Sequence, residues 1–170
     1  NEKPRPVDAF DAKADAIAAI AACGIPADQL QAAAGNAGAA NWYHPGRSGT
    51  LSLGMKPVLA QFGEVHPAVL AAFDLKGPLV ACEVFLDRLP PAKTKASKAR
   101  PQFAASDLPA VERDFAFVVD SSVAADALVR AARTADRAHI VHVGVFDVFE
   151  GQALGPGKKS LALSIRLQPK

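Results

Sequence analysis

The segment RDFAFVVD (Arg113–Asp120), followed by VFDVFEG (Val145–Gly151) and GKKSLALSIRLQ (Gly157–Gln168), decides the fold of the second half of this 170-residue chain. These pieces are rich in aromatic, β-branched or alternating apolar residues, which is typical of strands. The expected elements are strands Val111–Asp120, Ile140–Phe149 and Lys159–Gln168, a helix Val123–Ala135 capped by Ser121 or Ser122, and a loop Glu150–Gly157.

The last expected strand has the clearest pattern. Leu161, Leu163, Ile165 and Leu167 alternate with Ser160, Ala162, Ser164 and Arg166. Because side chains alternate between the two faces of a strand, one face is aliphatic and the other is small and polar. We expect the aliphatic face to pack against the helix through Leu128, Val129 and Ala132, and the other face to stay open.

The first half of the chain predicts an antiparallel sheet with covering helices, so the whole chain is expected to be α+β. The expected helices are Val7–Cys23, capped by Asp8 or Asp11, a short turn at Asp28–Ala34, and Ala68–Phe73 after His66 and Pro67. The expected strands are Thr50–Leu53, Pro57–Val65 and Leu79–Leu86, the last buried on both faces.

Composition divides the chain further. Residues 90–105 contain three prolines, four basic and no acidic side chains, and no large aliphatic residue, so we interpret them as a basic linker. The predicted domains are therefore 1–89 and 106–170. The net charge of +2 is too small to indicate nucleic-acid binding by itself.

Several classes of site are disfavoured by the pattern. Cys23 and Cys82 are far apart, and the four histidines do not cluster, so we predict neither a disulfide nor a metal site. Gly151–Ser160 lacks the spacing of a phosphate-binding loop. No apolar run approaches the ~20 residues of a membrane span, and we expect a cytoplasmic location.

Motifs in a fixed order link the chain to a known family. RDFAF, FDVFEG, GKKSLA and LQP follow one another between Arg113 and Pro169, and WYHPGRSG (Trp42–Gly49), LAQFGEVHP (Leu59–Pro67) and FLD (Phe85–Asp87) lie upstream. Together they resemble the C-terminal part of the bacterial phenylalanyl-tRNA synthetase beta subunit. The resemblance implies that residues 1–89 end an inactive, class II synthetase-like catalytic domain. Residues 106–170 would then be part of a ferredoxin-fold anticodon-binding domain.

The resemblance also implies a function. This piece would serve as a scaffold and bind the anticodon region of phenylalanine tRNA, while the holoenzyme, a heterotetramer with the alpha subunit, performs ATP-dependent aminoacylation. No cofactor is expected in this fragment, and it is expected to be non-catalytic. ATP and magnesium would belong to the holoenzyme, and the editing and magnesium residues to segments upstream of Asn1.

Basic residues near the open face are the candidate tRNA contacts, because phosphates need only positive charge placed along the backbone. They are Arg113, Lys158, Lys159 and Arg166. Two further sets of residues each have two interpretations. Phosphate contacts or solvated side chains are the alternatives for the linker cations Lys93, Lys95, Lys98 and Arg100. Base stacking or packing in the core are the alternatives for Phe115, Phe117, Phe146 and Phe149. His44 and Arg47, within the loop expected at Tyr43–Gly49, are candidates for a vestigial active-site loop or for the subunit interface.

Two further expectations concern the edge of the second domain. A ferredoxin-like fold runs β-α-β-β-α-β, of which this chain supplies a truncated β-α-β-β. By analogy with the family, the absent strand pairs with Val111–Asp120, so that strand would be an open edge. We expect the fragment either to be marginally stable alone or to self-associate through that edge. The alternative reading is a stand-alone ferredoxin-like regulatory or protein-interaction module.

Overall fold

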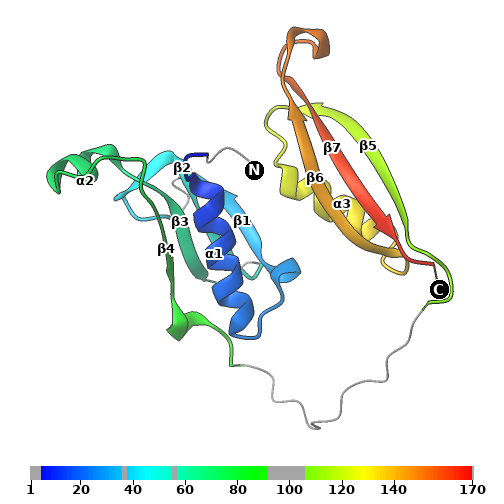
Figure 1. Ribbon diagram of the computed structural model, residues 1–170, viewed down its shortest axis with the longest axis horizontal. Helices are drawn as coiled ribbons and strands as arrows, with labels where there is room; N and C mark the ends of the chain where they lie inside the picture. The colour runs from blue at the N-terminus through cyan, green and yellow to red at the C-terminus, as the bar shows by residue number, and fades with distance from the viewer. Residues whose placement is uncertain (1–4, 36–37, 55–56, 92–105, 170) are drawn as a thin grey trace. The chain divides into compact units, whose positions relative to one another are not determined.

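The computed structural model describes residues 5–35, 38–54, 57–91 and 106–169. The chain divides into two compact units, residues 1–98 and 99–170, each built on one antiparallel sheet (Figure 1). The predicted α+β fold class is confirmed. Most of the predicted basic linker lies outside the described residues. Among the described residues, no helix has the length and apolarity needed to cross a membrane.

The first unit is a four-stranded sheet in the order β1-β2-β3-β4. Its strands are β1 (Gln31–Ala34), β2 (Tyr43–Ser52), β3 (Val58–Val65) and β4 (Val80–Val84). Its helices are α1 (Ala9–Ala22) and α2 (Pro67–Ala72), with short 3-10 turns at η1 (Ala27–Gln29) and η2 (Leu86–Arg88). The helices predicted at Val7–Cys23 and Ala68–Phe73 are therefore confirmed, as α1 and α2.

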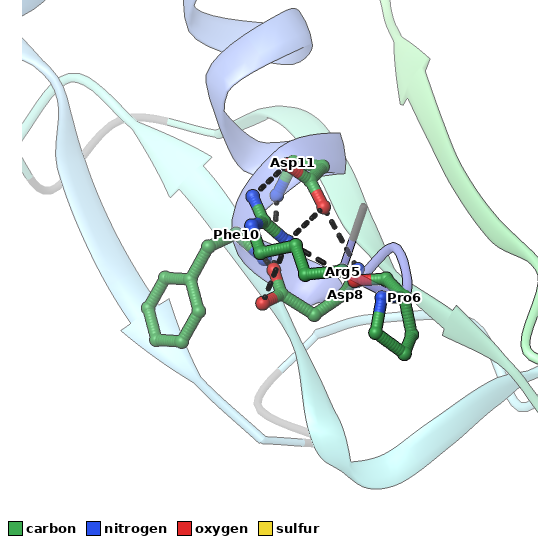
Figure 2. A network of polar contacts seen from close by, with 5 residues as sticks. All are labelled: Arg5, Pro6, Asp8, Phe10 and Asp11. Atoms are coloured by element: carbon green, nitrogen blue, oxygen red, sulfur yellow. Dashed lines mark hydrogen bonds and ion pairs between the residues drawn. The ribbon is translucent and has the colours of Figure 1, made fainter. Parts of the chain in front are cut away.

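A reciprocal cap starts α1 (Figure 2). The carboxylate of Asp8 accepts hydrogen bonds from the N–H groups of Phe10 and Asp11, and the carboxylate of Asp11 accepts one from the N–H of Asp8. Arg5 donates to Asp11 at 2.5 Å, which lowers the pKa of that carboxyl. At the other end, Gly24 takes a positive φ of 93°, a conformation that glycine adopts without strain.

One stripe of α1 forms the core of this unit. Ala12, Ala16 and Ile20 recur every four residues and are buried against the sheet, where Leu51 and Phe62 lie in the same cluster. Recurrence at this spacing places side chains on one face of a helix. The alanines allow the helix to approach the strands closely, and α1 packs mainly on β3 and β4.

Three expectations for this unit are wrong. Gln31–Ala34 is a strand and not a helical turn, because pairing with β2 outweighs the helical preference of three alanines. Tyr43–Gly49 lies in β2 and not in a loop: the strand pairs with β3 at Tyr43 and again at Ser48, with a register shift between. Finally, β4 is an outer strand with Glu83 exposed and its other residues half-buried.

The second unit has the element order β5 (Val111–Asp120), α3 (Ala125–Ala135), β6 (Ile140–Phe149), η3 (Gln152–Leu154) and β7 (Lys158–Leu167). Its sheet order is β5-β7-β6, so β7 is the central strand, antiparallel to both neighbours. This is the predicted β-α-β-β arrangement. The bounds of β5 and β6 agree with the prediction to the residue.

The predicted inward face of β7 is confirmed. Leu161, Leu163 and Ile165 are buried, and Leu128, Val129 and Ala132 of α3 pack against β6 and β7. Figure 1 shows α3 lying along this sheet. The predicted cap is wrong, since α3 begins after Ala124 and no side chain caps it. Beyond this core, Phe115 and Phe117 of β5 remain 46% and 38% exposed, so part of the apolar face is uncovered.

Candidate nucleic-acid interface

The face of β7 opposite α3 carries small side chains and one guanidinium. It is made of Ser160, Ala162, Ser164 and Arg166, of which the first three are half-buried and Arg166 is exposed. Small side chains on a central strand leave its face low and even, so a planar group can approach the sheet. We call this surface the open face.

The pairing register gives the residues that flank β7 on the open face. On β5 they are Glu112, Asp114, Ala116, Val118 and Asp120, and on β6 they are His142, Gly144, Asp147 and Phe149. Residues directly opposite one another in an antiparallel pair point to the same side of the sheet. The open face therefore has an uncharged centre with carboxylates on both flanks, and it is not a cationic surface.

Arg166 lies at one end of this face. It stands between Glu112 on β5 and His142 on β6, and all three side chains are exposed. A guanidinium in this position is hydrated and able to meet a phosphate, although the neighbouring carboxylate weakens its field. Arg166 therefore lies on the face of β7 on which alternation places it.

Lys158 and Lys159 lie at the opposite end of β7. Lys158 precedes Arg166 by eight positions, which is about 26 Å along the strand. The ammonium of Lys158 is 2.7 Å from the carboxylate of Asp120, and that of Lys159 donates to the carbonyl of Ser121 at 2.8 Å. The lysines and Arg166 therefore do not form one cluster.

Arg113 belongs to the other face of the sheet. Its partner on β7 is Ile165, which is buried beneath α3, whereas Glu112 and Asp114 on either side of it point toward the open face. Its guanidinium donates to the carbonyl of Glu112 at 3.0 Å. The structure thus separates Arg113 from the surface that carries Arg166.

Phe149 is the aromatic residue that the register places on the open face. It lies opposite Ser160 of β7 and is 51% exposed. Val118 of β5, which is also exposed, pairs with Ser160 from the other side. A Cβ built at Gly151 would come within 2.7 Å of the Phe149 ring, so the ring rests directly against the backbone there. The glycine of the FDVFEG motif therefore provides the space in which the ring is held.

A β-bulge explains why sequence reasoning missed this position. Val145 pairs with Leu163 but Asp147 pairs with the adjacent Ala162, so Phe146 is an extra residue in β6. Strict alternation from Val145 would turn Asp147 and Phe149 toward the helix. Because the bulge inserts one residue, both point to the open face. A signal was present in the acidic residue at Asp147, which is unsuited to a face packed against α3.

In the first unit, the candidates His44 and Arg47 both lie on β2. Arg47 donates to the carboxylate of Glu64 on β3 at 2.7 Å, and its side chain remains more than half exposed. The imidazole of His44 accepts the N–H of Gly46 and lies 6.4 Å, between ring centroids, from His66, the residue that caps α2. Arg47 thus already has an anionic partner within the chain.

A polar network that joins two buried residues to the exposed Glu83 lies beside these residues and was not predicted. Gln61 is 5% exposed; its amide oxygen accepts the N–H of Ala40 at 2.8 Å and its amide nitrogen donates to Glu83. The buried hydroxyl of Tyr43 lies 3.5 Å from Glu83, and burial raises the pKa of that hydroxyl. The network ties residues 38–43 to the sheet. Within the described ranges, no three His, Cys, Asp or Glu side chains gather as metal ligands.

Comparison with known proteins agrees with this architecture. The family model described as "Phenylalanyl tRNA synthetase beta chain CLM domain" matches residues 1–86, and that described as "Ferredoxin-fold anticodon binding domain" matches residues 106–170. Phenylalanine–tRNA ligase beta subunits are similar along nearly the whole chain. The one from Paramagnetospirillum magneticum is 56% identical over 97% of this chain and 20% of its own length. The one from Mesorhizobium japonicum is 54% identical over 96% and 20%.

A third relative, from Bartonella henselae, is 51% identical over 99% of this chain and 21% of its own length. The chain thus spans about a fifth of the length of the curated relatives it matches. The family match to the first unit covers more than half of the chain, and the second unit has the strand order and the open sheet face described above. The chain belongs to the phenylalanyl-tRNA synthetase beta chain family.

Proposed function

We propose that this chain acts within the beta subunit of a phenylalanine–tRNA ligase. Residues 106–170 bind the anticodon region of phenylalanine tRNA, and residues 1–89 serve as a scaffold without chemistry of their own. The observation that carries the proposal is the open face of the sheet. It presents the half-exposed ring of Phe149 on β6 at one end and the exposed guanidinium of Arg166 on β7 at the other. The anticodon-binding family match of the same residues supports it.

Phe149 is the proposed base-stacking residue. Single-stranded RNA is commonly recognised by sheet faces on which unstacked bases lie against aromatic rings. The ring is half exposed and rests against Gly151, and its neighbour Ser160 is too small to block a base. Asp147, on the same face, offers a carboxylate that accepts hydrogen bonds from the N–H groups of a base.

Arg166 is the proposed phosphate contact. It is exposed at the far end of the open face, and phosphate contacts position an RNA without reading its sequence. Lys158 and Lys159 border the end that carries Phe149. Since Asp120 neutralises Lys158 in the free protein, we assign Lys158 a smaller share of the attraction than Arg166. Arg113 has no place in this site.

The remaining roles concern the whole enzyme. The partner subunit is proposed to be the alpha chain, and aminoacylation by the cytoplasmic holoenzyme is proposed to consume ATP with magnesium. No residue of this chain is assigned to ATP or magnesium. His44 and Arg47 are proposed to contribute to the surface facing the alpha chain. The proposed boundaries remain 1–89, 90–105 and 106–170. We also propose that the chain self-associates through the outer edge of β5.

A rival function is a protein-interaction module that does not bind RNA. The carboxylates along the open face favour it, because they repel phosphates. Fluorescence titration of labelled phenylalanine tRNA at several salt concentrations separates the two. Under our proposal Phe149→Ala and Arg166→Ala weaken binding, whereas Phe146→Ala and Arg113→Ala, exposed residues off the open face, do not.

The two variants are expected to differ in salt dependence. Arg166→Ala reduces the slope of log K against log salt by about 0.7, the value for one phosphate contact to a single strand. Phe149→Ala lowers affinity without changing the slope, because stacking releases no counterions. Equal affinities for all four variants and the parent chain would refute the anticodon site and favour the rival.

A further inference from the structure

A histidine on β6 repeats the arrangement that holds Phe149. The ring of Phe149 rests against Gly151, two positions further along the chain, and the ring of His142 rests in the same way against Gly144. A Cβ built at Gly144 would lie 3.2 Å from Nε2 of His142. Residues two apart on an extended chain share a face, so each ring leans over a residue that has no side chain. The open face therefore carries two planar rings held by the same local arrangement.

A second β-bulge turns His142 to the open face. The pairing of β6 with β7 shifts register between Ile140 and His142, so Val141 is an extra residue in β6. Ile140 packs against the core beneath α3, and strict alternation from it would place His142 on the α3 side as well. Because of the bulge, His142 lies on the open face, as Phe149 does after the bulge in the middle of β6.

His142 and Arg166 are also unusual in having no polar partner within the chain. Each of the other three histidines takes part in a hydrogen bond, namely His44, His66 and His139. Each of the other three candidate cations donates to an oxygen of the chain, namely Arg113, Lys158 and Lys159. Among the residues that the structure describes, the side chains of His142 and Arg166 make no such bond. They lie directly opposite each other on β6 and β7, so their polar groups are available together to a ligand.

We propose that His142 and Arg166 form a second nucleotide subsite on the open face. A base of single-stranded RNA stacks on the imidazole, and the adjoining phosphate meets the guanidinium. The inference rests on the proposed tRNA-binding function and adds a subsite to the one at Phe149. Histidine rings serve as stacking platforms for unpaired bases, and the planar guanidinium matches the oxygens of a phosphate. One nucleotide is thus held through its base and its phosphate at once.

The two subsites hold different nucleotides. On β7, Phe149 is paired with Ser160 and His142 with Arg166. Ser160 precedes Arg166 by six positions, which is about 20 Å along the strand. Because stacked nucleotides of one strand follow each other at about 3.4 Å, no single nucleotide reaches both rings. An RNA strand that contacts both must run along β7, and the two stacking contacts are then independent of each other.

The charges around Arg166 favour an approach over β6. Glu112 lies opposite Arg166 on β5, and its carboxylate repels a phosphate from that side. On β6, the nearest residues of the open face are His142 and, one row further along, Gly144, neither of which carries a carboxylate. A nucleotide that approaches over β6 therefore meets the imidazole and the guanidinium before it meets Glu112.

Fluorescence titration of labelled phenylalanine tRNA at several salt concentrations tests the subsite. His142→Ala is expected to weaken binding about fivefold or more, the effect of one lost stacking contact, without changing the slope of log K against log salt. His142→Phe keeps a ring and is expected to bind like the parent chain. His142→Gln keeps a polar group without a ring and should lose as much affinity as His142→Ala. His139→Ala, at a histidine in the turn before β6, is the matched control and binds like the parent. Thermal unfolding checks that each variant remains folded.

A double-mutant cycle separates this subsite from the one at Phe149. The losses from His142→Ala and Phe149→Ala are expected to add, because the rings hold different nucleotides. The losses from His142→Ala and Arg166→Ala should sum to less, because both hold the same nucleotide. Parental affinity of His142→Ala, or a His142→Phe variant as weak as His142→Ala, overturns the subsite. If Phe149→Ala and Arg166→Ala weaken binding in that case, the anticodon site stands without it. If all three alanine variants bind like the parent, the proposed function fails as well.

Discussion

Replacing Gly151 by alanine is expected to weaken tRNA binding by displacing a neighbouring ring. The added Cβ would lie 2.7 Å from Cζ and 3.0 Å from Cε1 of Phe149, closer than carbon atoms approach in proteins. The backbone at Gly151 is extended, with φ at −167°, so an alanine fits there without backbone strain. The contact is therefore relieved by movement of the Phe149 ring.

The size of the effect follows from the parts involved. Stacking of a base on an aromatic ring contributes about 1–3 kcal/mol, a factor of about 5–150 in affinity, which bounds the loss from Phe149→Ala. Gly151→Ala keeps the ring but shifts it, so its loss lies below that of Phe149→Ala. Stability is expected to be unchanged or up to about 1 kcal/mol higher, because alanine restricts the unfolded chain.

A double-mutant cycle provides the assay. Dissociation constants for labelled phenylalanine tRNA are measured for the parent chain, Gly151→Ala, Phe149→Ala and the double variant, with thermal unfolding of each. In the Phe149→Ala background, Gly151→Ala should have no further effect, because the ring that it displaces is absent. An equal loss in both backgrounds would show that Gly151 acts through its own backbone, and the reasoning would be refuted.

Four further outcomes are expected. Leu163→Ala, at a side chain with no exposed surface, should destabilise the chain by about 2–5 kcal/mol in urea unfolding. Gln61→Leu leaves the N–H of Ala40 without its partner and should cost about 1–3 kcal/mol. The hydrogen bond from His139 lowers the pKa of Asp136 in the folded protein. The stability contributed by this hydrogen bond is therefore present above the ordinary carboxyl pKa and is lost as the pH falls through the pKa of Asp136 in the folded state. A carboxyl titration by NMR checks this. Deleting Phe146 should preserve fold and tRNA affinity, because the deletion removes the bulge and leaves every other pair in register; loss of binding would contradict this.

Much of the second unit was predictable because large apolar residues alternate with small or polar ones along β7. The alternation of Leu161, Leu163 and Ile165 identified the buried face of β7, and the bounds of β5 and β6 followed from runs of β-branched and aromatic residues. The first unit was less predictable. The alanines of β1 carry no pattern of their own, and only pairing with β2 makes them a strand.

The composition of the candidate site could not be read from one strand at a time. Arg113 and Arg166 both seemed available as cations, but the register of β5 against β7 puts them on opposite faces. Register depends on contacts between segments about 50 residues apart, which local periodicity does not encode. The sequence therefore located the open face and the four residues of β7 on it, whereas the residues of β5 and β6 that flank them could be assigned only from the strand pairing.

The bulge in β6 links the sequence motif to the proposed chemistry. One extra residue, Phe146, changes which side of the sheet the following residues occupy, so that Asp147 and Phe149 leave the core while Val148 joins the apolar side. If Phe146 were instead paired with β7 in regular alternation, Asp147 would lie under α3, at a cost that a small domain does not withstand. Gly151 then makes room for the ring that the bulge has turned outward. The residues of FDVFEG thus act together, and a reading of any one of them by alternation alone assigns it to the wrong face.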